Sequence, residues 1–391
     1  MAATRILVLT YEYPPIGGGG GRVAREIARR LSKQNFEFHI ITARWGNLPK
    51  FNRENGIYLH RIWAGRSHPD RCSIFEMGLY LISSTVFAIQ ALKHIRPHLV
   101  HVHFAVPSGP LGYLIKKLYN IPYLITLHGG DVPGFLPEET DFVFRVIKPF
   151  TVPIWKEAEY VIAVSESLKE LAEQAYPGIP VLVIPNGIDV PLTFSQYESG
   201  KQKVRILFIG RFSKQKDPVL FVKSINILLN MDANLKNKID VWMIGDGYLR
   251  PVVERYNKKF GLTDVIKITG WMNDMDISKI LAQADILVNT SRAEGFSLAI
   301  LQAMASGVAV VATNVPGNRE VIQHRVTGLL TSPGSASQLA SAIYDLIFNE
   351  ELRDYIKKNA FCSIKKYDWD LICSKYAQIY KSVCEKRGLQ P

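Results

Sequence analysis

The sequence predicts an α/β protein built from two Rossmann-like domains, each with a parallel sheet covered by helices on both faces. Its 391 residues suit two domains of ordinary size. Short apolar runs that resemble buried strands alternate with helical patterns in both halves of the chain. This alternation is interrupted once, by the polar and aperiodic residues 191–203, which we expect to be a linker. The predicted domains are residues 1–196 and 204–370.

The first half contains six apolar runs that predict strands, and the second half contains five. The first six are residues 5–10, 36–43, 99–104, 122–128, 160–165 and 181–187. The other five are residues 204–211, 239–247, 265–271, 286–291 and 308–313. Parallel α/β sheets bind ligands at the carboxyl ends of their strands, so we expect a ligand in a crevice at the carboxyl ends of both sheets.

Apolar segments, cysteines and the amino terminus together predict a cytoplasmic protein. Residues 78–92 form an uncharged and strongly apolar stretch, which is shorter than the roughly 20 residues of a membrane span. We expect a well-buried helix there, and an amphipathic helix from about Trp369 onwards. No signal peptide is visible. The four cysteines contain no C-x-x-C pair, which favours structural thiols in a reducing compartment.

The charge distribution predicts an anionic partner for the first part of the chain. The net charge is +12, and residues 1–130 carry 16 Lys and Arg against 6 Asp and Glu. Such a basic region suits a phosphorylated substrate, an anionic membrane surface or nucleic acid. No nucleic-acid-binding module accompanies it, so we exclude nucleic acid and retain peripheral association with the cytoplasmic face of a membrane as an expectation.

Five consecutive glycines follow the first predicted strand, in "PPIGGGGGR" at residues 14–22. A flexible surface loop is the simple interpretation. The segment nevertheless lies between a strand and a helical pattern, where α/β proteins present backbone N–H groups to an anionic ligand. Arg22 occupies the position that needs Gly in G-x-G-x-x-G and Lys in the P-loop motif. Dinucleotide oxidoreductases and P-loop NTPases are therefore disfavoured.

Two segments of the second half carry groups suited to a diphosphate and a sugar. In "GRFSKQKD", Arg211 and Lys216 follow a strand and suit a diphosphate, although a solvated basic loop is the alternative. In "NTSRAEGFSLAILQAMASG", a helix is expected to begin near Phe296, so that early amides can bind phosphate. Glu294 lies at the same point, where it can bind hydroxyls or act as an ordinary helix N-terminal charge.

A histidine follows a strand of the first half in "TLHGGDV". Lone histidines are more often structural. His128, however, is followed by two glycines and Asp131 at the carboxyl end of a predicted strand, which favours a functional role.

These segments together resemble the GT-B retaining glycosyltransferases of family 4, along nearly the whole chain. The resemblance rests on "PPIGGGGGRVAREIARRL", "PHLVHVHF", "TLHGGD", "VSESLKEL", "VIPNGID", "GRFSKQKD", "MIGDGYLR", "ITGWM", "AQADILVNTSRAEGFSLAILQAMASGVAVVAT" and "REVIQHRVTGLL", which occur in the family's order. It implies two Rossmann-like domains, with residues 371–391 packing back on the first. It also implies transfer of a hexose-type sugar from a UDP- or GDP-sugar to a hydroxyl of a glycan or lipid-linked acceptor, with retention and without a cofactor or metal.

The resemblance also implies roles for individual residues. The catalytic group is His128, Arg211, Lys216 and Glu294. The donor-binding group is Gly17, Gly18, Gly19, Gly210, Trp271, Met272, Gly295, Phe296, Ser297, Leu298 and Gln302. The acceptor side is Gly20, Gly21, His103 and Asp131. Arg211 and Lys216 would hold the donor diphosphate, Glu294 would contact sugar hydroxyls, and the glycine loop would close over the ligands.

One position departs from the family's pattern. The family has a second Glu eight positions after the first, to bind the donor ribose, and this chain has Gln302 there. The amide can still hydrogen-bond but loses the strength of a charged acceptor. Two D-x-D matches, Asp274–Asp276 and Asp368–Asp370, resemble a metal motif of another transferase fold. We interpret both as ordinary helix-start acids.

Two other functions remain open at this point. A nucleotide-sugar 2-epimerase of the same fold would use the same nucleotide site. A non-catalytic sugar-nucleotide-binding protein is suggested only by Gln302. The sequence identifies neither the sugar, nor the acceptor, nor an oligomeric state.

Overall fold

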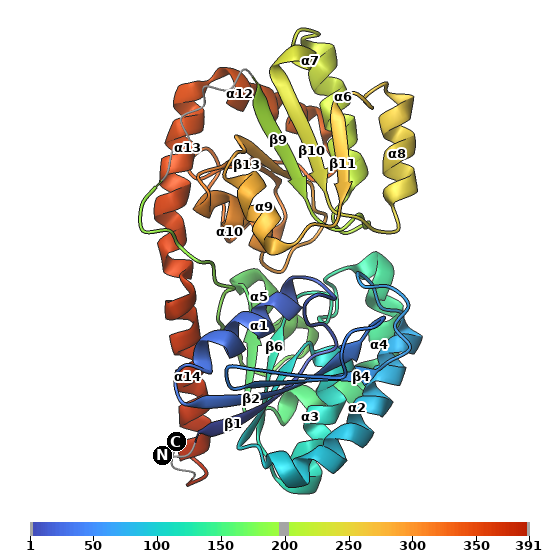
Figure 1. Cartoon of the computed structure of the whole chain (residues 1–391), viewed down its shortest axis with the longest axis vertical. Helices are drawn as coiled ribbons and strands as arrows, with labels where there is room; N and C mark the ends of the chain where they lie inside the picture. Colours follow the sequence, from blue (N-terminus) through green and yellow to red (C-terminus); the bar gives the residue numbers. More distant parts are fainter. Residues whose placement is uncertain (1–2, 195–202, 389–391) are drawn as a thin grey trace. The chain divides into compact units, whose positions relative to one another are not determined.

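The computed structural model describes residues 3–194 and 203–388, which form two compact units (Figure 1). The N-terminal unit comprises Met1–Gly187 together with Trp369–Pro391, and the C-terminal unit comprises Ile188–Asp368. Most of the predicted linker, residues 195–202, lies outside the described residues. Each unit contains a sheet with helices on both faces, as the alternating sequence pattern predicts.

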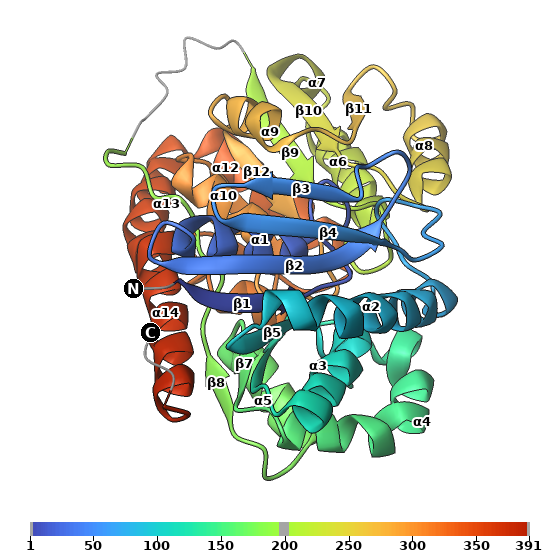
Figure 2. The same ribbon diagram turned by 60° about the horizontal axis from the view of Figure 1, so that its bottom comes forward.

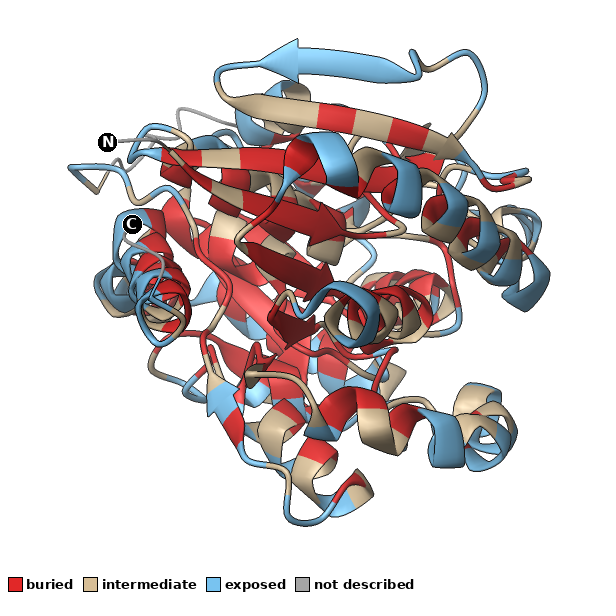
Figure 3. Cartoon of the chain, turned by 90° about the horizontal axis from the view of Figure 1, so that it is seen from below, coloured by how far each residue is buried: buried red, intermediate tan, exposed pale blue. Residues whose placement is uncertain are grey.

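The sheet of the N-terminal unit has eight strands in the order β3-β4-β2-β1-β5-β6-β7-β8. The strands are β1 (Thr4–Leu9), β2 (Phe36–Arg44), β3 (Phe51–Glu54), β4 (Ile57–Trp63), β5 (Leu99–His103), β6 (Tyr123–Leu127), β7 (Tyr160–Ala163) and β8 (Val181–Val183). All neighbours pair in parallel except β3 and β4, which form an antiparallel hairpin at the edge. Figure 3 shows the central strands buried and β3 exposed, as expected when helices cover only the middle of the sheet.

The helices of this unit are α1 (Gly19–Leu31), α2 (Ile74–Ile95), α3 (Ala105–Tyr119), α4 (Pro137–Lys156), α5 (Glu166–Ala175) and α14 (Trp369–Glu385). Figure 2 shows α2 and α3 on one face of the sheet and α1 on the other. The last helix, α14, belongs to this unit by its contacts: Tyr380 hydrogen-bonds His101 on β5 at 2.7 Å, and Asp370 pairs with Arg30 on α1 at 3.0 Å. The amphipathic pattern from Trp369 onwards therefore predicted this helix correctly.

The expectation of a well-buried helix at residues 78–92 is wrong. The helix forms, as α2, but only 22% of its most apolar 18-residue window is buried. Its buried residues Tyr80, Ser84, Ala88 and Leu92 recur every four positions, so a single stripe packs on the unit. Apolar side chains on the other faces, including Ile82 and Val86, are exposed.

The sheet of the C-terminal unit has six parallel strands in the order β11-β10-β9-β12-β13-β14. The strands are β9 (Val204–Ile209), β10 (Ile239–Ile244), β11 (Ile266–Gly270), β12 (Ile286–Asn289), β13 (Ala309–Thr313) and β14 (Leu329–Thr331). The helices are α6 (Pro218–Met231), α7 (Leu235–Lys238), α8 (Arg250–Lys259), α9 (Asp274–Leu281), α10 (Leu298–Ala305), α11 (Pro316–Arg319), α12 (Ala336–Phe348) and α13 (Glu350–Ser363), followed by the 3₁₀ turn η1 (Ile364–Tyr367). Counted from β9, this is the 3-2-1-4-5-6 order of the Rossmann fold.

Each sheet has one point at which the strand order reverses. In the N-terminal unit this point lies between β1 and β5, and in the C-terminal unit it lies between β9 and β12. The chain leaves the carboxyl ends of such a strand pair in opposite directions, which opens a crevice where open α/β sheets bind ligands. The loops at these ends are the predicted sites: the glycine loop follows β1, the segment containing Arg211 and Lys216 follows β9, and the segment containing Glu294 follows β12.

Candidate active site

The loops after β9 and β12 in the C-terminal unit are joined by hydrogen bonds. The Arg292 N–H donates to the Gln215 carbonyl at 2.7 Å, and the Thr290 hydroxyl donates to the Lys216 carbonyl at 2.8 Å. These bonds fix the backbone on either side of the reversal point. The side chains carried by the two loops therefore meet in one place.

Glu294 is the centre of this place, and its side chain is held by several partners. One oxygen, Oε1, accepts an ion-pair hydrogen bond from Lys216 Nζ. The same oxygen accepts from the Ser291 hydroxyl at 2.7 Å and from Asn289 Nδ2 at 3.3 Å. Glu294 is 7% exposed, so its charge is compensated by this network rather than by water. The structure brings two of the predicted catalytic residues, Lys216 and Glu294, into direct contact.

A second layer orients Asn289. Its Oδ1 accepts from the Asn318 side chain at 3.2 Å, and Asn318 also donates to the Thr313 carbonyl at 2.9 Å. Gly317 lies against the Glu294 backbone, because a Cβ at Gly317 would be 2.1 Å from the Glu294 carbonyl oxygen. The Glu294 loop is thus held from β12, β13 and α11.

Arg211 differs from Lys216 in its surroundings. It is half-buried and lies directly after Gly210 at the end of β9. Within residues 3–194 and 203–388, its guanidinium makes no hydrogen bond or ion pair. A half-buried guanidinium of this kind is suited to binding an anion such as a phosphate.

The helix after Glu294 begins two residues later than its predicted start, as α10 at Leu298. Ser297 is its N-cap, and its hydroxyl accepts no capping hydrogen bond from the first turn. Gly295, Phe296 and Ser297 therefore form the loop that leads into the helix. Gln302, which departs from the family pattern, is half-buried one turn into α10.

Two more predicted donor-binding residues follow β11, which is an edge strand of the same sheet. Trp271 is half exposed and Met272 is half-buried. The carbonyl of Gly270, before them, accepts from the Gly245 N–H at 2.9 Å. This hydrogen bond fixes the end of β11, and Trp271 and Met272 follow directly after it.

The glycine loop of the N-terminal unit is closely packed. The Gly18 N–H donates to Glu12 Oε2 at 2.7 Å, and the Gly17 N–H donates to the Pro69 carbonyl at 2.8 Å. A Cβ at Gly20 would lie 2.3 Å from the Phe104 ring and 2.9 Å from the His128 ring. The alternative of a flexible surface loop is therefore wrong: glycine is needed because neighbouring side chains occupy the space. The glycine segment does lead into a helix, but the helix starts earlier than predicted: α1 begins at Gly19, so only Gly17 and Gly18 precede it, and Gly20 and Gly21 lie in its first turn.

His128 follows β6 and lies beside His103 at the end of β5. The His103 Nδ1 and His128 Nε2 atoms are 3.0 Å apart, and the two rings are stacked. Asp131 acts on the backbone here: its carboxylate accepts from the N–H groups of His128 and Gly129 at 2.9 and 3.0 Å, and from the Ala105 N–H at 2.8 Å. Asp131 therefore joins the loops after β5 and β6 and positions His128.

Phe104 is a residue that the sequence analysis missed. Its φ of +69° is unusual for a bulky side chain, and its ring contacts Tyr11 at 4.9 Å and His128 at 4.6 Å between centroids. Glu12 was missed as well, although it binds the glycine loop. Asn289, Ser291 and Asn318 were also missed, and only Asn289 and Ser291 lie inside a quoted motif.

The histidines on β5 and in the loop after β6 are neutral at pH 7. Burial lowers the pKa of His128 and of His101 to about 3, and it holds the pKa of His103 well below the ordinary value. At neutral pH these rings therefore act as neutral hydrogen-bond donors and acceptors.

These shifts predict how stability depends on pH. Because unfolding returns each imidazole to a pKa near 6.5, the unfolded chain binds more protons below that pH. For His101 and His128 the stabilisation is complete above about pH 6.5 and falls as the pH drops towards 3, by about 1.4 kcal/mol per pH unit for each of the two. Imidazole NMR signals of His101 and His128 should stay at their neutral positions at pH 5. Signals that shift between pH 7 and 6 would contradict this prediction.

The D-x-D matches are helix-start acids. Asp274 and Asp276 lie in the first turn of α9, where the Asp276 N–H donates to Asn273. Asp370 lies in the first turn of α14 and pairs with Arg30. Within the described part of the chain, no group of three or more His, Cys, Asp or Glu side chains could hold a metal ion.

Comparisons with known proteins cover both units. The family profile described as glycosyl transferases group 1 matches residues 189–361, and the profile described as Glycosyltransferase Family 4 matches residues 17–191. The N-acetyl-alpha-D-glucosaminyl L-malate synthase of Bacillus anthracis is 26% identical over 95% of this chain and 95% of that protein.

Two solved structures show the same fold. Sucrose-phosphate synthase from Thermosynechococcus elongatus has a TM-score of 0.84 at 19% identity, covering 98% of this chain and 100% of that one. Anabaena HepE in complex with UDP and glucose has a TM-score of 0.77 at 20% identity, covering 97% and 100%.

Proposed function

This chain belongs to glycosyltransferase family 4 and has the GT-B fold, and on that premise we propose that it is a retaining, metal-independent hexosyltransferase. The donor is a UDP- or GDP-sugar, and the acceptor is a hydroxyl of a glycan or lipid-linked molecule. The contact between Lys216 and Glu294 at the reversal point of the C-terminal sheet carries this proposal. The contact supports the proposal because it joins a cation suited to a diphosphate with a carboxylate suited to sugar hydroxyls.

The proposed reaction breaks the bond between the anomeric carbon and the donor's terminal phosphate oxygen. The acceptor oxygen forms the new bond on the same face of the sugar. Its proton passes to the departing phosphate oxygen, so that no side chain needs to act as a general base. The products are the glycoside and a nucleoside diphosphate.

The C-terminal unit supplies charge stabilisation in this reaction. The Arg211 guanidinium and the Lys216 ammonium neutralise the charge that develops on the leaving diphosphate, and amides at the start of α10 assist. Glu294 holds the sugar hydroxyls through the oxygen that is not paired with Lys216. These cations take the role that a divalent metal has in other transferases, which supports metal independence.

The N-terminal unit positions the acceptor in this proposal. Gly20, Gly21, His103 and Asp131 shape the acceptor side, and neutral His128 hydrogen-bonds near the reacting centre. Because burial keeps the pKa of His128 near 3, it contributes as a neutral partner and not as a cation.

A donor panel tests the function. The protein is incubated in EDTA with UDP- and GDP-sugars, and nucleoside diphosphate release is measured with and without glycan acceptors. UDP-sugars come first, because the neighbour HepE is described with UDP and glucose. We expect slow donor hydrolysis that an acceptor accelerates. Release of an epimerised free sugar would identify a 2-epimerase, binding without turnover would identify a non-catalytic protein, and activity only after adding Mg²⁺ would contradict metal independence.

Gln302 provides a test of donor binding. If Gln302 binds the donor ribose, Gln302→Glu should lower the donor KM several-fold with little change in kcat, because a charged hydrogen bond exceeds a neutral one by about 1 kcal/mol. Gln302→Leu should raise KM by a similar factor. If neither variant changes donor affinity, the ribose role of Gln302 is wrong.

We also propose peripheral membrane association through α2 and α4 of the N-terminal unit. Phe75 on α2 is 74% exposed, and Phe142 and Phe150 on α4 are 78% and 73% exposed. These exposed phenylalanines lie on two helices that both pack against α3, so they give this side of the unit apolar anchors suited to a membrane surface. Within the described residues α2 alone is long and apolar enough to cross a membrane, but its Tyr80 stripe packs inside the unit. It is therefore suited to lie in the membrane interface.

Vesicle binding tests this surface. Phe142→Asp combined with Phe150→Asp should weaken binding to phosphatidylglycerol vesicles at least about tenfold, since each buried phenylalanine contributes about 2 kcal/mol. The control Tyr355→Asp replaces an exposed aromatic residue of the other unit, on α13, and should change nothing. Added salt should weaken binding of the wild type, because basic residues attract the anionic lipid. Equal binding of both variants would exclude the α4 face as the contact.

A further inference from the structure

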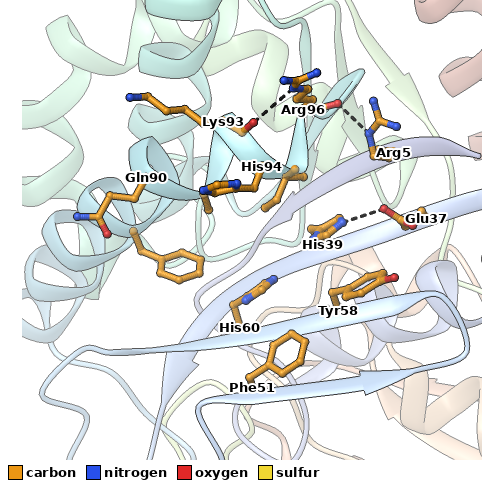
Figure 4. A pocket seen from close by; sticks show the side chains of 13 residues that line it. Arg5, Glu37, His39, Phe51, Tyr58, His60, Gln90, Lys93, His94 and Arg96 are labelled. Atoms are coloured by element: carbon orange, nitrogen blue, oxygen red, sulfur yellow. Dashed lines mark hydrogen bonds and ion pairs between the residues drawn. The ribbon is translucent and has the colours of Figure 1, made fainter.

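The N-terminal unit has a second pocket, at the opposite end of its sheet from the candidate active site. The pocket is about 850 Å³ and lies where β1, β2 and β4 begin, beside the last turns of α2 (Figure 4). Arg5 on β1 lines it, whereas Glu12 and the glycine loop lie past the other end of the same strand. At about 3.3 Å per residue, the six residues of β1 separate the two places by about 20 Å.

The strand side of the pocket is formed by stacked rings. His39 on β2 stacks on Tyr58 of β4, with 4.5 Å between centroids, and lies parallel to His60 at 5.9 Å. His60 in turn contacts Phe51 at 5.2 Å and Phe87 of α2 at 5.1 Å. These residues share one face because strand side chains alternate, so β2 and β4 together present a continuous surface of ring faces and edges (Figure 4).

Two buried ring nitrogens in this surface have no hydrogen-bond partner among residues 3–194 and 203–388. His39 is 9% exposed: its Nε2 pairs with Glu37 at 2.9 Å, while its Nδ1 is unpaired. The buried Nε2 of His60 is also unpaired. Burial lowers the pKa of His60 to about 4 and lowers that of His39, so both rings are neutral at pH 7. Buried polar atoms are nearly always paired, so these two nitrogens indicate a missing partner.

The helix side of the pocket adds positive charge. Arg5, Lys93 and Arg96 line the pocket, against the single carboxylate of Glu37. Arg5 Nε donates to the Arg96 carbonyl at 3.0 Å, and Arg96 Nε donates to the Lys93 carbonyl at 3.4 Å. These bonds offset the negative end of the α2 dipole. The net charge of the lining therefore favours an anion.

We propose that this pocket binds the phosphate ester of a sugar or cyclic polyol. The ring of the ligand lies on the stacked rings, its hydroxyls pair with the free nitrogens of His39 and His60, and its phosphate lies near Lys93 and Arg96. A hydroxyl both donates and accepts, so it satisfies either imidazole tautomer. The site goes beyond the proposed transferase function and shares no residue with the Lys216–Glu294 site.

Calorimetric titration with glucose 6-phosphate tests the proposal, with glucose and inorganic phosphate as separate probes. We expect glucose 6-phosphate to bind at least about tenfold more tightly than either part. Lys93→Met should weaken this binding about tenfold, and the exposed control Lys33→Met should leave it unchanged. His60→Phe keeps the ring but removes the nitrogen, and should also weaken binding. In the wild type, the His39 and His60 ring ¹⁵N signals should shift on titration.

The phosphate ester can be soluble or can be a lipid headgroup, and vesicles distinguish the two sources. A lipid headgroup is assigned if the protein binds phosphatidylinositol vesicles more tightly than equally charged phosphatidylglycerol vesicles. Lys93→Met should then abolish this excess binding. Binding of glucose 6-phosphate alone assigns a soluble ligand. Absence of both, or equal affinity of wild type, Lys93→Met and His60→Phe, overturns the proposal. UDP binding in each variant is measured in parallel and should be unchanged, so failure of the transferase function is recognised separately.

Discussion

Replacing Arg211 by alanine is expected to lower kcat by about 10²- to 10³-fold, with the thermal midpoint nearly unchanged. The guanidinium makes no ion pair within the described residues, so its removal leaves no charge uncompensated in the resting protein. In the transition state it would stabilise the leaving diphosphate, and loss of one such preorganised group costs about 3 kcal/mol. Steady-state kinetics and thermal denaturation measure the two quantities.

Lys216→Ala should reduce kcat as strongly, but with a cost in stability. Lys216 pairs with Glu294, so its removal leaves a nearly buried carboxylate with only neutral partners. The double variant Lys216→Met with Glu294→Gln should recover stability without recovering activity. Lys214→Ala removes an exposed cation of the same loop and is the matched control. Near-normal turnover of Arg211→Ala or Lys216→Ala would remove that residue from the diphosphate site.

Gly20→Ala is expected to reduce activity by about 10²-fold or more. The added Cβ would lie 2.3 Å from Phe104 and 2.9 Å from His128, both within van der Waals exclusion. The first turn of α1 or the His128 ring must then move by up to about 1 Å, and a shift of that size near the reacting groups costs about 10²-fold in rate. Phe104 cannot easily give way, because it is buried and packs against Tyr11.

Gly130→Ala is the matched control for this variant. Gly130 belongs to the loop after His128, and a Cβ there meets nothing within 4 Å. Equal kinetics of Gly20→Ala and wild type would show that the close packing of the glycine loop is not needed for turnover.

The strand and helix pattern predicted the fold because parallel α/β sheets leave a strong periodic signal. The runs at residues 5–10 and 204–211 became β1 and β9, the first strands of the two sheets. The edge hairpin of β3 and β4 was missed, because β3 is exposed along its whole length and carries no apolar run. An Asn55–Gly56 turn, with φ of 46° and 79°, was the available signal for it.

The site was predicted in part, since motifs name residues that lie within one loop. Lys216 and Glu294 were identified from their loops, but their contact depends on the pairing of β9 with β12. Asn318 contacts Asn289, and Glu12 contacts the glycine segment. Both residues lie outside the quoted motifs and carry no distinctive sequence pattern, so only the three-dimensional structure identifies them. The burial of α2 was misjudged because composition indicates how apolar a helix is, but not how many of its faces are covered.

The anomeric configuration of the first product distinguishes a retaining transferase from an inverting one. Real-time ¹H NMR follows the wild-type protein with an α-linked nucleotide sugar that the donor panel has identified. We expect the first sugar product to carry the α configuration and to form together with nucleoside diphosphate, and we expect EDTA to have no effect. A first product with the β configuration would contradict the retaining mechanism, and no release of nucleoside diphosphate from any donor would contradict the transferase function itself.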